Sequence, residues 1–563
     1  MKPVPWTTRP LPTLWLNART GTGVDNAGRP ITPVIRGRRQ NPNLEDILNT
    51  AQVEGIKRII LIGPIPERDR HGRHWFESDL DDWRHGQHWL SGGPPVGRYF
   101  HKTQPRGEKG EKPYEVSLVS AWFSSANLSP QQAREAWELT ERVVVREDDS
   151  MQGLMKSPAG TGQQMWAQSL PPKADFPLVA DDIAEELHLN SGQHHIEHLV
   201  EGPGFIEHEF CRPLMRQERG EKMPGFAYVD GRFMYAACGG NLGVGPATRM
   251  RAQEAAELWF AEDNGRRVGQ FQPAYYSVRV RVPEGWNTLG IMPLKHTTPD
   301  GQRVWVWPNI PGAEFDTWVG NEELRLAEEC GWQFRFHEGI SFQNKKPAER
   351  EKGKLTEARP LDTFCKRITT ARERVETLAQ ENGIDPVIAK AASGALRAIL
   401  LQTIGSFASR GRAMTVYVDS TWDVPPEYEH TMQVRGDQIS YQAMNPMSEK
   451  QRAYYRPELA VQVWSRARAR VLHGPMAGGQ KRGALHLDPE TLIGVQGDAL
   501  YTTSLPEWSL PTERGGLDDG KPGRLRLKGF LDHPDAPVPT TVAARLRLAR
   551  SAEAAGLSMI AGE

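Results

Sequence analysis

The chain has 563 residues and a formal net charge of −1, with 38% hydrophobic and 25% charged residues. This composition is that of a soluble globular protein, and the length predicts about three or four domains or subdomains. No stretch approaches the roughly 18 apolar residues of a membrane span, and the N-terminus lacks the apolar region of a signal peptide. The four cysteines show no paired metal spacing and are expected to be reduced thiols, which predicts a cytoplasmic protein.

Residues 1–200 are expected to form a separate module, with short strands at 14–16 and 58–63 and a helix at 131–143. The Gly/Pro-rich segment 156–162 is expected to be a loop. It is not a P-loop, because no Gly-Lys-Ser/Thr follows.

Three histidines, His194, His195 and His198, lie close together in the sequence, and His194 and His198 would share one face of a helix. A metal site would need a third ligand that the sequence does not show. The Gly-rich segment 239–245 also lacks the lysine of a phosphate-binding loop, so a connecting loop is favoured.

Strands dominate from 226 to 340, and helices become frequent after it. The segment 275–282 alternates apolar and other residues, as expected for a half-buried strand. The further predicted elements are a strand at 304–307, a helix at 321–330, a strand at 333–338, helices at 361–381, 386–409 and 457–472, a strand at 524–529 and a helix at 542–555.

Two hydrophobic segments that each lead to a carboxylate are the most informative pattern. The first, 226–230, ends on Asp230, and the second, 492–498, ends on Asp498. Two carboxylates presented in this way can share a pair of Mg²⁺ ions, the arrangement that drives phosphoryl transfer. A lone Asp after a strand is also compatible with an ordinary turn residue.

Basic residues gather between the two acids, from Lys345 to Arg374 and again from Arg466 to Arg482. Such clusters can bind phosphate groups, but they are equally typical of a solvated surface. The first cluster includes the start of the predicted helix pair, and the second lies mainly on the predicted helix 457–472.

Taken in order, these segments resemble the family B DNA polymerases, in particular divergent forms of actinobacterial phages and mobile elements. Residues 230–236 resemble the first palm motif, Asp-x-x-Ser-Leu-Tyr-Pro, and residues 496–499 resemble the second, Asp-Thr-Asp-Ser. Residues 397–405 resemble the fingers motif, Lys-x-x-x-Asn-Ser-x-Tyr-Gly. Residues 524–529 resemble the basic strand near the thumb. The resemblance covers about residues 220–535.

The resemblance implies an α+β fold with palm, fingers and thumb. It also implies an N-terminal degenerate RNase H-like domain of the exonuclease type. The implied divisions are 1–200 for the N-terminal exonuclease-like or DNA-binding domain, 201–345 for the first part of the palm, 346–410 for the fingers, 411–510 for the second part of the palm and 511–563 for the thumb or C-terminal region.

In this resemblance, Asp230 and Asp498 hold two Mg²⁺ ions and are the catalytic residues. Tyr235 excludes a ribose 2′-hydroxyl, although it could also be a core aromatic. The residues expected to bind the nucleotide are Tyr235, Arg397, Lys366, Arg367 and Arg372. Those expected to bind DNA are Arg526, Lys528, Arg466 and Arg470.

Departures from the family pattern qualify the expected activity. The first acid of the second palm motif is Gln496, and the fingers lysine is Arg397, which still binds phosphate or could simply extend to solvent. The strand before Asn17 and Arg19 lacks both exonuclease carboxylates. We therefore expect a DNA-templated polymerase without proofreading, acting on a primer-template and deoxynucleoside triphosphates.

Other functions fit the same residues. One is a catalytically weak or silent polymerase fold that binds DNA as a scaffold in replication or DNA-end maintenance. Another is a polymerase with a protein primer, for which a priming or replication-accessory protein would be a further partner. An RNA template is also compatible with the same palm chemistry.

Overall fold

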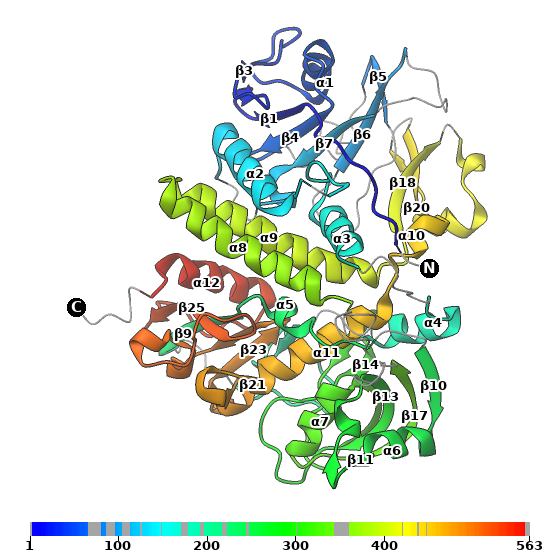
Figure 1. Ribbon diagram of the computed structural model, residues 1–563, viewed down its shortest axis with the longest axis vertical. Helices are drawn as coiled ribbons and strands as arrows, with labels where there is room; N and C mark the ends of the chain where they lie inside the picture. The colour runs from blue at the N-terminus through cyan, green and yellow to red at the C-terminus, as the bar shows by residue number, and fades with distance from the viewer. Residues whose placement is uncertain are drawn as a thin grey trace. The chain divides into compact units, whose positions relative to one another are not determined.

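The computed structural model describes residues 3–65, 80–85, 96–103, 113–123, 127–147, 149–170, 178–191, 196–216, 222–243, 247–299, 301–342, 360–418, 420–435, 438–445 and 447–557. The chain divides into two compact units, and both combine α-helices with β-sheets (Figure 1), in agreement with a mixed α+β class. Unit 1 consists mainly of Leu170–Lys366 and Arg456–Glu563, and unit 2 of Pro3–Ser169 and Arg367–Tyr455. Each unit is assembled from stretches that lie far apart in the sequence.

A seven-stranded sheet in the order β3-β2-β1-β4-β7-β6-β5 lies in unit 2. β4 runs parallel to both β1 and β7, whereas the remaining neighbours pair antiparallel. The strands predicted at 14–16 and 58–63 are β1 and β4, two central strands of this sheet. The strands are β1 Thr13–Asn17, β2 Gly23–Val24, β3 Pro30–Ile31, β4 Arg58–Ile62, β5 Trp83–His85, β6 Val96–His101 and β7 Tyr114–Leu118.

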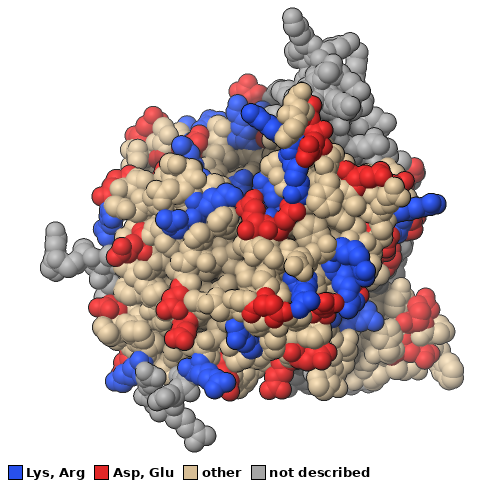
Figure 2. All heavy atoms as spheres, turned by 90° about the horizontal axis from the view of Figure 1, so that it is seen from below, with Lys and Arg blue, Asp and Glu red and all other residues tan. Residues whose placement is uncertain are grey.

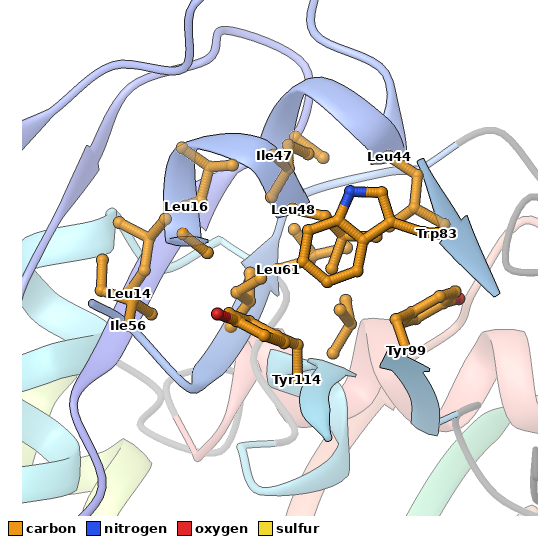
Figure 3. Packing of buried hydrophobic residues seen from close by; sticks show 14 of the residues in the cluster. Leu14, Leu16, Leu44, Ile47, Leu48, Ile56, Leu61, Trp83, Tyr99 and Tyr114 are labelled. Carbon is orange, nitrogen blue, oxygen red and sulfur yellow. The ribbon is translucent and has the colours of Figure 1, made fainter. Parts of the chain in front are cut away.

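Helices cover both faces of the central strands, because successive side chains of a strand point to opposite faces. Leu14 of β1 packs in a core cluster with α1 (Leu44–Val53), shown from close by in Figure 3. The next residue, Trp15, meets Trp137 of α2 (Pro130–Val144) with 6.4 Å between the ring centroids. The continuous apolar run of β1 is therefore explained by burial on both sides.

Two long helices, α8 (Asp362–Glu381) and α9 (Pro386–Phe407), match the predicted pair. α9 lies in unit 2, where it packs against α2 and α3 (Pro158–Ser169). A three-stranded antiparallel sheet, β18-β20-β19, completes the unit. Its strands are β18 Arg412–Val418, β19 Gln433–Arg435 and β20 Gln438–Asn445.

The loop expected at 156–162 is wrong, because α3 begins at Pro158. The glycines that suggested a loop serve helix packing instead. A Cβ on Gly162 would overlap the hydroxyl of Thr403 on α9, so glycine lets the two helices approach closely. Tertiary packing outweighs the low helix propensity of this segment.

In the described part of the chain, α9 is the one helix that is long and apolar enough to cross a membrane, with a mean hydropathy of 1.4. This corrects the expectation that no stretch of the chain approaches such a length. Half of the apolar stretch is buried within the protein, including Ala392, Leu396 and Ile399. Packing in unit 2 accounts for the apolar composition of this helix.

Unit 1 contains a five-stranded antiparallel sheet in the order β25-β9-β24-β23-β8. The strands come from four separate parts of the chain. Two helices that pack in this unit are α11 (Pro457–His473) and α12 (Val542–Ala555). The strands are β8 Ile196–His198, β9 Gly225–Gly231, β23 Leu492–Gln496, β24 Ala499–Thr502 and β25 Leu525–Asp532.

A second antiparallel sheet of unit 1, β10-β17-β13-β16, matches the strands expected near 275–282 and 333–338. Helix α7 (Asn321–Glu329) follows β16 as predicted, and β14 pairs with β15 beside this sheet. The strands are β10 Ala247–Arg251, β13 Ala274–Arg281, β14 Leu294–Thr297, β15 Arg303–Val306, β16 Glu314–Gly320 and β17 Gln333–Phe342.

The compact units do not follow the five consecutive divisions expected from the sequence. Residues 170–200, expected in the N-terminal domain, belong to unit 1, and their strand β8 is an edge of the five-stranded sheet. Residues 411–455, expected in the second part of the palm, belong to unit 2. The C-terminal region 511–563 is not separate, because β25 pairs with β9.

The core cluster of unit 2 allows a matched test on one helix. Leu48 of α1 is fully buried in this cluster, whereas Val53 at the end of α1 is 85% exposed. We expect Leu48→Ala to lower the free energy of unfolding by about 2–5 kcal/mol, because it leaves a cavity. Val53→Ala should change it by less than about 0.5 kcal/mol. Hydrogen exchange of peptides covering β1 and β4 would measure both effects, and equal losses of protection would contradict the packing.

Candidate functional site

The two carboxylates singled out in the sequence lie at the same end of the five-stranded sheet. Asp230 is the penultimate residue of β9, and Asp498 lies in the turn between β23 and β24. β24 pairs with β9 so that Ala499 is opposite Asp230. The backbone N–H of Gly231 donates to the carbonyl oxygen of Asp498 at 2.9 Å. We call Asp230 and Asp498 the acid pair.

Close packing places Asp498 beside Gly231, the residue that follows Asp230. A Cβ added to Gly231 would lie 3.1 Å from Cβ of Asp498 and 2.9 Å from Cβ of Met234. Glycine at this position therefore lets the β23–β24 hairpin approach the end of β9. Asp230 is only 1% exposed, whereas Asp498 is half-buried, so solvent reaches the acid pair from the side of the hairpin turn.

An unusual turn follows Asp230. Phe233 has φ of +44° and ψ of +44°, a left-handed conformation that is costly for a bulky side chain and concentrates at functional sites. Arg232, just before it, forms a 2.6 Å ion pair with the buried Asp518, which fixes the turn. Tyr235 then lies half-buried in the first turn of α5 (Met234–Cys238).

The acid pair suits a hydrated divalent cation better than a closed metal cage. Among the residues that the structure describes, no group of three or more His, Cys, Asp or Glu side chains could hold a metal ion. Mg²⁺ in phosphoryl-transfer sites keeps several waters and uses one or two protein carboxylates together with substrate phosphates. Two carboxylates fit that mode of binding.

The histidine cluster does not form the expected helical arrangement. His198 lies in the strand β8, and its Nδ1 is 3.2 Å from Nη1 of Arg545. Burial, with a contribution from the Arg545 charge, lowers the pKa of His198 to about 4, so its ring is neutral and forms part of the core. His194 and His195 lie outside the described residues.

Two of the predicted DNA-binding residues lie on β25, next to the acid pair. Arg526 is directly opposite Asp230 in the register of β25 and β9, so their side chains emerge on the same face. The ammonium of Lys528 forms a 2.9 Å ion pair with Glu553 of α12. Part of the positive charge predicted for DNA contact is therefore neutralised within the protein.

Helix α12 covers the middle of the sheet face that carries Asp230. Ala549 and Ala552 of α12 pack in one core cluster with Phe226 and Tyr501, and α12 lies against β25 and β9 (Figure 1). Arg545 is fully buried, with its guanidinium 4.9 Å from the ring centroid of Tyr501. Ala499, opposite Asp230, belongs to the same cluster, so the cover extends to the row of Asp230, Ala499 and Arg526 at the end of the sheet that carries the hairpin turn.

Arg367 does not have the role expected from the sequence. Its side chain is buried and forms an ion pair with Asp149, and one of its nitrogens donates to the carbonyl oxygen of Val144 at 2.6 Å. These bonds join α8 to the end of α2 within unit 2. The predicted contact of Arg367 with a nucleotide is not supported by this geometry, because the guanidinium is already used in the core.

The other basic residues of the helix pair have different surroundings. Arg372 is half-buried and forms a 3.2 Å ion pair with Glu376, one turn along α8. Lys366 is exposed, and Arg397 is half-buried on α9. Contact of Lys366, Arg372 and Arg397 with a triphosphate stays a prediction.

The predicted DNA-binding arginines of α11 also differ from each other. Arg466 donates to the carbonyl oxygens of Gly240 and, at 3.2 Å, Asn241, so it closes the C-terminal end of α5 and has little freedom to reach DNA. Arg470, one turn later, is half-buried and lines a cavity. On the face drawn in Figure 2, acidic and basic side chains are interspersed.

The expected loss of exonuclease carboxylates has a clear structural counterpart. Asn17 ends β1, and its Oδ1 accepts hydrogen bonds from the backbone N–H groups of Arg19 at 3.0 Å and Thr20 at 3.1 Å. The side-chain amide of Asn17 thus closes the turn after β1. This is the position at which the exonuclease motif would have a catalytic carboxylate.

Sequence patterns did not identify the supporting residues of the acid pair. Arg232 and Asp518 form their ion pair across a long stretch of sequence, and Gly231 is recognisable only once the hairpin is seen beside it. A signal was present for Gly231, since a glycine directly after a strand-ending carboxylate allows a close backbone approach.

The close approach at Gly231 predicts a specific sensitivity. Gly231→Ala should lower the free energy of unfolding by about 1–3 kcal/mol, because the added methyl group must displace the hairpin or α5. Gly285→Ala is a matched control in the same unit, since no atom lies within 4 Å of its added Cβ. Urea unfolding of both variants would test this, and equal changes would contradict the close contact of Gly231 with Asp498.

No protein-family model matches the chain, and no curated protein matches it. Among solved structures, the chain is similar to phi29 DNA polymerase in an orthorhombic crystal form, with 10% sequence identity. The match covers 93% of this chain and 85% of the polymerase, with a TM-score of 0.47. A likeness this distant carries no information on chemistry.

Proposed function

We propose that this protein is a DNA-templated DNA polymerase that uses two Mg²⁺ ions at the acid pair and replicates a phage or mobile element. The observation that carries the proposal is the acid pair itself. Two strands far apart in the sequence bring Asp230 and Asp498 to the same end of one sheet. The order of the motifs along the chain supports the more specific assignment to DNA synthesis.

The residues present suit each requirement of nucleotidyl transfer. Asp230 and Asp498 would hold the cations, and the phosphates of the incoming nucleotide would complete their coordination. When bound, Mg²⁺ supplies the charge that activates the 3′-hydroxyl and stabilises the leaving pyrophosphate. The β9–β24 pairing fixes the position of both acids, and the burial of Asp230 strengthens its attraction for a cation. Tyr235 is proposed to exclude a ribose 2′-hydroxyl.

The N-terminal sheet is proposed to be an RNase H-like domain that has lost its nuclease activity. Strands β1, β2 and β3 form an antiparallel meander, and β4 and β7 run parallel to β1. The resulting order, β3-β2-β1-β4-β7, is the strand order of an RNase H-like sheet. Asn17 occupies the end of β1 and binds the following turn. Because an amide cannot replace a carboxylate as a metal-binding anion, we propose that this polymerase lacks proofreading.

A second candidate function is a DNA-binding scaffold with little or no catalysis. Helix α12 favours this function, because it packs across the sheet face that carries Asp230 and would restrict access to that acid. In addition, Glu553 of α12 forms an ion pair with Lys528. Arg526 opposite Asp230 adds a positive charge beside the acid that would hold a cation. The two candidates differ in one measurable property, the incorporation of nucleotides.

Primer extension with purified protein tests the proposal. We expect Mg²⁺-dependent extension of a DNA primer-template, and we expect Asp230→Asn and Asp498→Asn each to slow it by about 100-fold or more, because each removes half of the anionic site. Asp532→Asn is the matched control, since Asp532 is exposed at the far end of β25. It should leave the rate unchanged.

Three outcomes are decisive. Extension lost only in the two acid-pair variants supports the polymerase. DNA binding without any incorporation by the natural sequence supports the scaffold. Extension that persists in Asp498→Asn would contradict the role of the acid pair.

A further inference from the structure

A cavity of about 510 Å³ lies in unit 1, lined by α5, α7, α11 and the segments around 271 and 481. This volume is within the range of small-molecule sites in proteins. Neither acid of the acid pair lines it, whereas Arg466 and Arg470, two of the residues expected to bind DNA, do.

Positive charge dominates the cavity wall. Four cationic side chains line the cavity, against two carboxylates, Glu322 and Glu329. Burial lowers the pKa of the lining His473, so this ring adds no charge near neutral pH. The cationic residues are Arg325, Arg466, Arg470 and Lys481.

Two of these cations remain available for an anion. The side chain of Arg470 forms no hydrogen bond or ion pair with any residue that the structure describes. Lys481 contacts Glu329 at 3.3 Å, and both side chains are nearly half exposed, so the pair contributes little and is easily opened. Arg470 and Lys481 thus offer a guanidinium and an ammonium to a phosphate group.

An aromatic ring completes the wall. Phe271 lines the cavity and is 52% exposed, so its ring is accessible from the cavity. The guanidinium of Arg325 lies 4.8 Å from the centroid of the Phe271 ring. An exposed ring supported by an arginine, next to further cations, is the combination on which nucleobases stack in single-stranded nucleic acid sites.

We propose that this cavity binds a nucleotide unit, with its base against Phe271 and its phosphate at Arg470 and Lys481. The unit is either a free nucleoside phosphate or one residue of a single-stranded nucleic acid, since both present the same base and phosphate. Neither acid of the acid pair lines this site, so binding there does not require Mg²⁺ or nucleotide incorporation.

Fluorescence anisotropy in EDTA tests the proposal, because the absence of divalent cations separates this site from the proposed polymerase chemistry. The probes are a labelled single-stranded oligothymidylate and a labelled AMP, with the full-length protein carrying Asp498→Asn. We expect Phe271→Ala to weaken binding by about fivefold or more. Lys481→Ala should weaken binding of both probes. For the oligonucleotide it should also lower the slope of log affinity against log salt concentration by the amount of about one phosphate contact.

Phe260→Ala is the matched control for Phe271→Ala. Phe260 is 53% exposed, lies in the same unit, and has the guanidinium of Arg267 4.9 Å from its ring centroid, but it does not line the cavity. It should bind both probes as the parent protein does. Unchanged thermal unfolding midpoints would show that each variant is folded.

The two probes distinguish the sources of the nucleotide. Binding of AMP that competes with the oligonucleotide supports a site for one free nucleotide unit, and binding of the oligonucleotide alone supports a single strand. The proposal is overturned if neither probe binds. It is also overturned if Phe271→Ala and Phe260→Ala bind equally well, or if Lys481→Ala binds as tightly as the parent protein.

Discussion

The antiparallel pairing of β9 with β24 is the interaction on which the rest of unit 1 depends. The two strands lie more than 250 residues apart in the sequence, and the register of their pairing places Ala499 opposite Asp230. A shift of one residue would move every side chain of β24 to the other face of the sheet. Gly231 allows the pairing to continue into the hairpin turn, where Asp498 lies. The candidate site is therefore a consequence of strand register.

Buried ionic contacts hold the edge of the same sheet. Glu197 of β8 accepts a 2.9 Å bond from the fully buried Arg468 of α11, and its backbone carbonyl accepts from Arg545 of α12 at 3.1 Å. Burial of such charges is costly, so removing one partner leaves an uncompensated charge in the core. The pairs fix α11 and α12 on the sheet. The same α12 covers much of the face beside Asp230, so structural support limits access to the candidate site.

Sequence patterns identified the longest helices and several of the central strands, because their signals are local. The period of β13, the helix at 131–143 and the carboxylates Asp230 and Asp498 were all visible without a structure. Interactions between distant residues were not. Arg367 looked like a phosphate ligand, but its partner Asp149 is more than two hundred residues away. Gly162 looked like a loop residue until Thr403 was placed beside it. The cavity at Phe271 likewise exists only in three dimensions.

Mn²⁺ affinity measured by electron paramagnetic resonance tests most directly whether Asp230 and Asp498 act as one cation site. The measurement compares the parent protein, Asp230→Asn, Asp498→Asn and the double variant, each with a deoxynucleoside triphosphate present. We predict that either single substitution weakens Mn²⁺ binding by about tenfold or more, and that the double variant is little weaker than the single ones, since a shared site is lost only once. Unchanged affinity in either single variant, or strictly additive losses, would contradict a shared site.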